Sequence, residues 1–269
     1  MKQEALIVVR GGGDLATGTI HRLWSAGLRV LVLEAEHPAA IRRQVALSEA
    51  VYEGETTVEG LRAVRIETLD GAAAVWAEHA VPVLVDPKGE SIARAKPEVV
   101  VDAILAKRNL GTCITDAPLV IGVGPGFTAG EDCHCVIETM RGHTLGRCIY
   151  SGSAIPNTGI PGNVGGYTVE RVLRTPCGGM FEPLKEIGDA VNAGETVARV
   201  DGQPVVSRIT GCLRGILPAG TLVPKAGFKA GDVDARCVRE HCFTISDKAL
   251  AIGGGVLEAV CHWRSEREN

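Results

Sequence analysis

Apolar runs of strand length alternate with amphipathic helical stretches in the first half of the chain. Residues 5–10 (ALIVVR) form a continuous apolar run, which is typical of a strand buried on both faces of a parallel sheet. An apolar-periodic helix from about Asp14 to Ala26 follows, ends at Gly27, and leads into a second strand over residues 28–34. We therefore expect a right-handed βαβ unit at the beginning of the chain.

The same texture continues to about residue 150. Further strands are predicted at 81–86, 98–102 and 119–123, with a more polar candidate at 134–139. Residues 56–66 are typical of a small β-hairpin inserted between helical stretches. The pattern predicts a Rossmann-like α/β domain with a parallel sheet over residues 1–150.

Short Val, Ile and Leu runs between glycine turns fill the second half, after a Gly- and Pro-rich linker at 151–174. The stretch 187–197 is echoed at 217–223, and the first copy resembles the barrel-sandwich domains that carry biotin or lipoate. We expect residues 175–269 to form such a mostly-β domain with a C-terminal helix. The hairpin at 200–205 contains no lysine, so a covalent carrier role is not expected.

The C-terminal helix has a predicted start and a predicted interruption. Ser246 and Asp247 give a capping signal, and three glycines at 253–255 would break the helix. Those glycines leave three interpretations open: a second anion cradle, a hinge, or close packing.

Composition narrows the function classes. A chain of 269 residues fits two domains, and its 34 glycines favour tight turns and backbone placed close to ligands. The net charge of −4 gives no basic face for nucleic acid or an anionic membrane. The first apolar run is too short for a signal peptide or a membrane span, so we expect a cytoplasmic protein whose nine cysteines are reduced.

A glycine-rich turn carries the main chemical signal. Gly11, Gly13 and Ala16 satisfy the G-x-G-x-x-G/A fingerprint between the first strand and the first helix, and Glu34 ends the second strand. Such a turn lets a phosphate approach bare backbone at a helix N-terminus. Asp14 departs from the usual pattern because a carboxylate repels a phosphate, so the identity of the ligand stays open. A turn that only packs is the other interpretation.

Other candidate residues follow the carboxyl ends of the predicted strands, where open α/β sheets bind ligands. Clustered Lys and Arg residues there would hold more than one phosphate, although each could equally be a solvated helix-end charge. Asp102 also falls at this edge. The candidate ligand-binding residues are Gly11, Gly12, Gly13, Asp14, Thr17, Glu34, Arg42, Arg43, Asp86, Lys88, Lys107, Arg108, Gly124, Gly126, Glu138 and Arg141.

The cysteines do not predict a metal site. Cys133 and Cys135 alternate with His134 on a predicted strand, so at most two ligands share a face, whereas zinc needs about four. A second cluster, Cys237 to Cys242, lacks a paired C-x-x-C. Cys133 is either an activated thiolate that carries sulfur or selenium, or a small apolar residue that fills a strand face.

Eight strings, taken together, resemble the YqeB family of accessory proteins for selenium-dependent molybdenum hydroxylases. They lie at residues 10–18 (RGGGDLATG), 41–43, 48–52, 106–109 (AKRN), 124–130 (GPGFTAG), 138–143, 156–162 (PNTGIPG) and 245–249. The N-terminal region is also similar to the nucleotide-binding part of xanthine dehydrogenase accessory factors. The resemblance implies maturation of the molybdenum cofactor or of the hydroxylase that receives it, and it transfers no catalytic residue.

Three function hypotheses follow from the residues and the resemblance. The first is a maturation factor that binds molybdenum cofactor or a related nucleotide and serves a molybdenum hydroxylase client. The second is an NAD(P)-dependent oxidoreductase, and the third is a non-catalytic docking partner of the hydroxylase. Whether the protein is an enzyme stays open. A retained pterin, a retained nicotinamide nucleotide, or no ligand would distinguish the three.

Overall fold

The computed structural model describes residues 5–268 and divides into two compact units. The first unit comprises residues 1–38, 46–157 and 245–269, and the second comprises residues 39–45 and 158–244. Each unit therefore contains a segment that is distant in sequence from the rest of it. Within the described residues, no helix is both long and apolar enough to cross a membrane.

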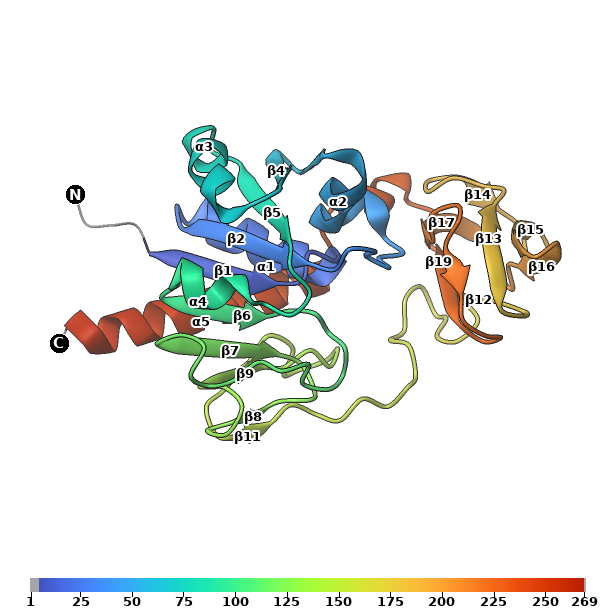
Figure 1. Cartoon of the computed structure of the whole chain (residues 1–269). Coiled ribbons are helices and arrows are strands. Elements are labelled where there is room, and N and C mark those ends of the chain that lie inside the picture. Colours follow the sequence, from blue (N-terminus) through green and yellow to red (C-terminus); the bar gives the residue numbers. More distant parts are fainter. Residues whose placement is uncertain (1–4, 269) are drawn as a thin grey trace. The chain divides into compact units, whose positions relative to one another are not determined.

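A nine-stranded sheet forms the centre of the first unit, in the order β10-β9-β7-β6-β1-β2-β5-β4-β3 (Figure 1). All neighbours are parallel except the edge pairs β10–β9 and β3–β4. The strands are β1 (Leu6–Arg10), β2 (Arg29–Glu34), β3 (Glu55–Val58), β4 (Leu61–Ile66), β5 (Val81–Val85), β6 (Val99–Asp102), β7 (Leu119–Val123), β9 (Cys135–Ile137) and β10 (Cys148–Ile149). A separate two-stranded sheet pairs β8 (Thr128–Ala129) with β11 (Gly152–Ser153).

The predicted α/β character of the first unit is confirmed, as is the predicted hairpin, which forms β3 and β4. The strands β5-β2-β1-β6-β7-β9 follow the order of doubly wound dinucleotide-binding sheets. In such sheets the first strands are added on one side of β1 and the later strands on its other side. This strand reversal, the point where the order changes side, lies between β1 and β6. These strands contain continuous apolar runs, such as residues 99–101 of β6. Because side chains of such a run point to both faces of the sheet, both faces must be covered.

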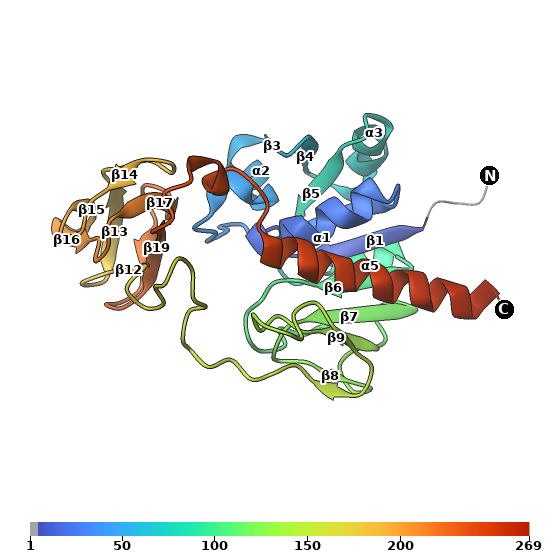
Figure 2. The same ribbon diagram turned by 180° about the vertical axis from the view of Figure 1, so that it is seen from behind.

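Helices cover the two faces of this sheet. On one face, α3 (Ala72–Ala77) and α4 (Ser91–Ala95) place Val75 and Ile92 in a buried cluster with Val8 of β1. On the other face, α1 (Asp14–Ser25) and α5 (Asp247–Glu268) run side by side, as Figure 2 shows. The first unit also contains α2 (Ala50–Glu53) and the short 3-10 helices η2 (Leu47–Glu49) and η3 (Leu69–Gly71).

The position of α5 corrects the predicted domain boundaries. The sequence analysis placed this helix in the predicted second domain, residues 175–269. In the structure it belongs to the first unit, where it contacts β7, β9 and β10. Residues 103–118 connect β6 to β7 without a helix, so α5 covers a part of the sheet that the connections leave bare. The glycines at 253–255 lie within a continuous α5 and do not break it.

The second unit consists of two four-stranded antiparallel sheets over a shared apolar core. One has the order β12-β19-β17-β14 and the other β16-β15-β13-β18. The strands are β12 (Val172–Arg174), β13 (Gly179–Pro183), β14 (Ala190–Val191), β15 (Thr196–Val200), β16 (Gln203–Val206), β17 (Gly211–Ile216), β18 (Leu222–Val223) and β19 (Lys229–Asp234), with 3-10 helices η1 (Arg43–Val45) and η4 (Arg239–Cys242). The turn between β15 and β16 holds Asp201 and Gly202 at positive φ, the conformation of a tight hairpin. Its tip carries no lysine.

The predicted linker at 151–174 is shorter in the structure. Its first residues form β11 and its last form β12, while residues 154–171 contain no strand or helix. The middle segment of the first unit, residues 46–157, ends inside this stretch.

Candidate functional site

The glycine-rich turn lies at the carboxyl ends of the parallel neighbours β1 and β6, from which the strand order runs outward on both sides. Gly11 follows β1 directly, with φ +97°, and a Cβ there would lie 2.9 Å from the carbonyl oxygen of Ala103. Only glycine allows the chain after β6 to pass this close. Gly11 therefore builds the turn by letting the two strand ends approach each other.

Gly13 differs from its neighbours because space is open around it. It is the N-cap of α1, its backbone is extended, and among residues 5–268 no atom beyond its own chain neighbours lies within 4 Å of the position a Cβ would take. In this described part of the chain, no side-chain hydrogen bond caps the start of α1. The first N–H groups of α1 and its dipole therefore face an open position that suits an anion. Asp14, the first helical residue, makes contacts of its own.

Glu34 closes the turn from the side of β2. Its Oε1 accepts a hydrogen bond from the Gly12 N–H at 2.8 Å, and its Oε2 accepts one from the Ala35 N–H at 2.6 Å. Burial raises the pKa of Glu34 above its ordinary value, against the opposing effect of these two bonds. The acidic residue that the sequence places at the end of the second strand is thus held against the turn itself.

A segment that sequence reasoning missed crosses the glycine turn. The Ser48 N–H donates to the Gly12 carbonyl at 2.9 Å, and the Leu47 N–H donates to Thr17 Oγ1 at 3.0 Å. The Thr17 hydroxyl in turn donates to the Gly13 carbonyl at 3.0 Å. The Ser48 hydroxyl is buried and has no hydrogen-bond partner within residues 5–268. Thr17 therefore fixes the turn, and Ser48 brings an unsatisfied hydroxyl beside it.

A buried polar network lies beside the turn, and Asp102 is the member of it that the sequence analysis placed at this edge. Arg10, at the end of β1, is only 2% exposed and donates to the Thr112 hydroxyl and, at 3.3 Å, to the Pro87 carbonyl. Thr112 donates to Asp102 Oδ2 at 2.6 Å, and Arg10 pairs with the same carboxylate at 3.7 Å. One indication of this network was present in the sequence, because Arg10 is a charged residue at the end of the apolar run 5–10. The network ties the ends of β1 and β6 to the loop that follows β6.

Two basic candidates, Lys107 and Arg108, lie in that loop. Both are exposed, and neither forms an ion pair within the described part of the chain. The loop that follows β7 packs directly on them, since a Cβ at Gly126 would lie 2.6 Å from the Arg108 nitrogen. Gly124 is similarly constrained by Thr139. The two predicted loops therefore meet at the carboxyl edge of the sheet.

Four other candidates at this edge have structural partners. Asp86 accepts hydrogen bonds from the Glu90 and Ser91 N–H groups at the start of α4, which lowers the pKa of Asp86 in spite of burial. Glu138 is buried and accepts bonds from the backbone of Met140 and Ile155. The remaining two form exposed ion pairs, Lys88 with Glu90 at 3.7 Å and Arg141 with Asp247 at 2.7 Å.

Arg42 and Arg43 belong to the second unit. Arg42 donates to the carbonyls of His241 and Thr244 at 3.0 and 3.2 Å, and Arg43 donates to the Ile216 carbonyl at 3.1 Å. The sequence analysis grouped them with the glycine turn because they follow β2 closely in sequence. In the structure their guanidinium groups hold residues 39–45 against the β-unit.

The thiol proposed as a sulfur or selenium carrier is buried. Cys133 has 0% exposure, and burial raises the pKa of its thiol to about 11. His134 accepts a hydrogen bond at Nδ1 from the Val120 N–H at 3.0 Å. Within residues 5–268, no group of three His, Cys, Asp or Glu side chains could hold a metal ion. Cys133 thus matches the apolar interpretation and not the activated one.

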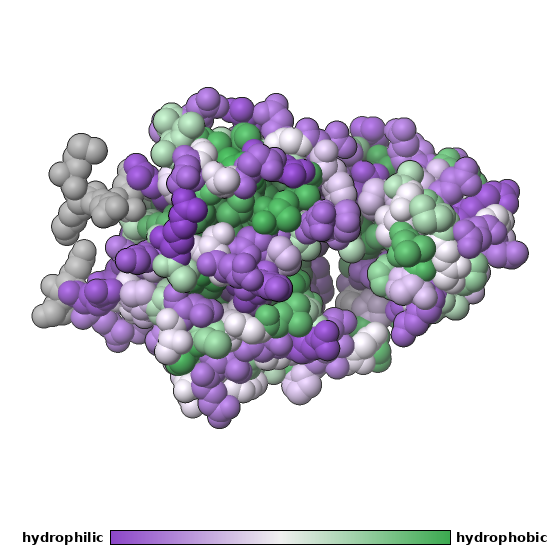
Figure 3. Space-filling view, viewed as in Figure 1, coloured by the Kyte–Doolittle hydropathy of each residue, from purple (hydrophilic) through white to green (hydrophobic). Residues whose placement is uncertain are grey.

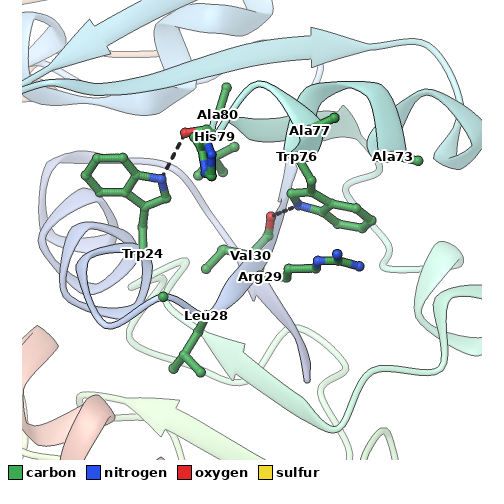
Figure 4. A pocket seen from close by; sticks show the side chains of 11 residues that line it. Trp24, Leu28, Arg29, Val30, Ala73, Trp76, Ala77, His79 and Ala80 are labelled. Carbon is green, nitrogen blue, oxygen red and sulfur yellow. Dashed lines mark hydrogen bonds between the residues drawn. The ribbon is translucent and has the colours of Figure 1, made fainter. Parts of the chain in front are cut away.

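A hollow of about 510 Å³ lies at the opposite edge of the sheet, by the amino ends of β2 and β5 (Figure 4). Trp24 and Trp76 line it, and each indole N–H donates to a backbone carbonyl, of His79 and Val30 respectively. Ligands of open α/β sheets bind at the carboxyl edge. We therefore place the candidate site at the glycine turn, where open space at Gly13 meets the N-terminus of α1.

Comparison with known proteins gives one relative and no family model. The chain is 49% identical over 256 residues, 95% of its length, to a protein of Escherichia coli (strain K12) described as uncharacterized, YqeB. No model of a protein family matches. Two solved structures, an aspartoacylase family protein of Mesorhizobium loti and the ectoine utilization protein EutE (DoeB) of Ruegeria pomeroyi, align over 86% of this chain and 85% of theirs. Their identities are 13% and 12% and their TM-scores are 0.26 and 0.24, values too low to indicate a shared fold. The chain is therefore similar along nearly all of its length to YqeB, a protein of which it spans about half.

Proposed function

We propose that this chain is a maturation factor for a selenium-dependent molybdenum hydroxylase and that it binds a phosphate-bearing cofactor at Gly11–Asp14. The observation that carries the binding part is the open position at Gly13, at an uncapped helix N-terminus beside the strand reversal. The hydroxylase client rests on the resemblance of the sequence strings. The cofactor is molybdenum cofactor or a nucleotide, both of which carry phosphate.

The residues present fit such a ligand. A phosphate at Gly13 would accept hydrogen bonds from the first N–H groups of α1, in the manner of other helix N-terminal anion sites. The Ser48 hydroxyl is buried beside Gly12 without a partner in the described residues, so it offers a further donor. Lys107 and Arg108 supply positive charge from the loop after β6. Glu34 and the Arg10 network hold the turn in shape before the ligand arrives.

The first prediction concerns Gly13. The Gly13→Val substitution places a branched side chain where the phosphate must meet bare backbone, so affinity should fall at least tenfold, about 1.4 kcal/mol. Calorimetric titration of the variant and the wild-type protein with a panel of nucleotides measures this. The pterin fluorescence of ligand released by denaturing the purified protein gives a second readout.

Gly254→Val is the matched control. Gly254 also has open space around its Cβ position, and it lies within α5, away from the glycine turn. The control should bind as the wild type does. Equal affinity of a folded Gly13→Val variant would place the ligand elsewhere.

An NAD(P)-dependent oxidoreductase is the second candidate, and Glu34 is the observation that favours it. An acidic residue at this position typically binds the ribose hydroxyls of NAD. Here each Glu34 oxygen already accepts a backbone hydrogen bond, although a carboxylate oxygen can accept another. A retained nicotinamide nucleotide, and loss of its binding in Glu34→Gln, would favour this function over the first.

A non-catalytic docking role is the third candidate. The second unit carries apolar side chains on its surface (Figure 3). Met180 of β13 and Leu222 of β18 pair in register and are 51% and 73% exposed. Hydroxylase binding that survives Gly13→Val but is lost in Met180→Ser/Leu222→Ser would support docking without a ligand.

A further inference from the structure

An arginine is buried in the second unit at an irregularity of its sheet. Arg214 lies on β17, where the pairing with β19 shifts register between Leu213 and Gly215. A bulge of this kind redirects the side chain of the extra residue and is common beside binding sites. Arg214 is only 7% exposed. The fold has therefore turned a cationic side chain inward.

The carboxylates near Arg214 are engaged by other arginines. Asp234 accepts hydrogen bonds from Arg236 at 2.9 Å (Nε to Oδ1) and 2.6 Å (Nη2 to Oδ2). Asp232 forms a close ion pair with Arg171. The Arg214 Nε lies 3.9 Å from Asp234 Oδ2, beyond hydrogen-bond distance, and it has no hydrogen-bond partner within residues 5–268. A buried Nε–H in this state lacks the hydrogen bond that normally offsets its loss of hydration.

A second arginine makes the surroundings of Arg214 more positive. A Cβ at Gly215, the next residue, would lie 3.1 Å from Cγ of Arg42, so the Arg42 stem passes directly beside this part of β17. Arg42 itself donates to the carbonyls of His241 and Thr244. Burial, and next the repulsion from Arg42, lower the pKa of Arg214 below its ordinary value, while Asp232 and Asp234 act in the opposite direction. Arg236, whose side chain is 43% exposed, marks the side of the group that reaches solvent.

We propose that Arg214, beside Arg42, forms a binding site for a small oxyanion, such as a phosphate group, within the second unit. The planar guanidinium presents donors in a fork that matches the oxygens of such an anion. An anion there would supply the hydrogen bonds that Arg214 Nε lacks and offset the repulsion between the two arginines. This site is separate from the glycine turn and does not depend on the function proposed for it.

The alternative is that Arg214 serves the fold alone, through its ion pair with Asp234. The two roles differ in their consequence for stability. If the ion pair is structural, removing the arginine lowers the stability of the protein, because the buried carboxylate of Asp234 then loses a positive neighbour. An arginine held for a ligand contributes less, because Arg236 and Arg171 already pair with Asp234 and Asp232. Replacing such an arginine with an apolar residue of similar length should leave stability unchanged or raise it, since the desolvation cost of its charge is removed.

The test uses the full chain with inorganic phosphate as the probe. All proteins carry Gly13→Val, so that the glycine turn does not contribute, and ionic strength is held constant. Arg214→Met should weaken phosphate binding at least tenfold in calorimetric titration. In phosphate-free buffer its urea midpoint should equal or exceed that of the parent. Sulfate should compete with phosphate, and acetate should compete less because it is a planar monoanion.

Arg208→Met is the matched control, because Arg208 is exposed in the same unit and the substitution makes the same change in charge. The control should bind phosphate as its parent does. Unchanged phosphate affinity in Arg214→Met would overturn the proposal, and so would a parent that binds no phosphate. A lower urea midpoint of Arg214→Met in phosphate-free buffer would also overturn it, because Arg214 would then be a structural residue.

Discussion

Single thiols in this protein differ widely in their surroundings. Cys113, Cys237 and Cys261 are exposed, whereas Cys133 and Cys135 are buried in the first unit. A thiol reacts through its thiolate, so both exposure and a low pKa are needed for reactivity. Cys133 has neither, since burial raises its pKa to about 11.

We expect alkylation to follow this order. At pH 7 an iodoacetamide reagent should label the three exposed cysteines first and should label Cys133 only when the protein unfolds. Because the pKa of Cys133 is raised, lowering the pH to 6 should suppress its reaction further. Peptide mass mapping of a time course measures each site. Fast labelling of Cys133 at pH 6 in the folded protein would favour the hypothesis that this thiol carries sulfur or selenium.

Residue-level inference from the sequence succeeded where a local pattern determines the backbone. The positions of Gly11 and Gly13 between a strand and a helix follow from local sequence, and the structure has both there. It failed where a side chain finds partners far away in sequence. Arg10 meets Thr112 after 102 positions, and no local pattern indicates which loop will return to it. The contacts of Arg42 with the carbonyls of His241 and Thr244 are also remote in sequence.

At the level of elements, the crossing of α1 and α5 depends on small residues. A Cβ at Gly18 would lie 2.5 Å from the backbone of Ala249, and a Cβ at Gly253 would lie 2.5 Å from the Gly18 carbonyl. Gly255 is equally tight against Gly146. The two helices thus approach at the distance that backbone contact allows. The packing of α5 on α1 accounts for Gly253, and its packing on Gly146 accounts for Gly255.

Opposite effects are therefore expected from two neighbouring substitutions in α5. Gly253→Val forces the helices apart and should lower the free energy of unfolding by roughly 3 kcal/mol, the upper range for overpacking. Gly254→Ala meets open space and should raise it by roughly 0.5–1 kcal/mol, because alanine favours a helix. Urea unfolding followed by circular dichroism compares them. A neutral Gly253→Val would mean that the helices do not pack as described.

The glycine run shows why the sequence predicted α5 only in part. The capping signal near Ser246 correctly indicated where the helix begins, because capping is a local property. Three glycines disfavour a helix by their intrinsic propensity, so the pattern indicated a break at Gly253. Packing against α1 overrides that propensity. Of the interpretations that the sequence left open, close packing is the one that the structure supports.

At the level of the whole molecule, the chain passes between the two units more than once, an arrangement that we call the exchange. Residues 39–45 leave the first unit and pack in the second, where Arg43 binds the Ile216 carbonyl. Residues 245–268 return from the second unit to the first, as α5. The sequence divided the chain once, near residue 150, because composition changes there. Segments of this kind carry no compositional signature.

Cutting the chain between the units should leave its pieces together. A site-specific protease sequence inserted after Thr158 lies in exposed chain without strand or helix. After cleavage, the N-terminal fragment keeps residues 39–45 in the second unit, and the C-terminal fragment keeps α5 on the first. The cut protein should therefore elute as one species in native size-exclusion chromatography and as two bands on a denaturing gel. Separation of the fragments under native conditions would contradict the exchange.

The return of α5 to the first unit also sets an order for assembly during synthesis. When residue 244 has left the ribosome, every part of the second unit exists, including residues 39–45 made much earlier. The first unit still lacks the helix that covers α1 and the strands β7, β9 and β10. Domains fold as their chain becomes complete. The glycine turn at the start of α1 therefore gains its full support only after the β-unit has formed.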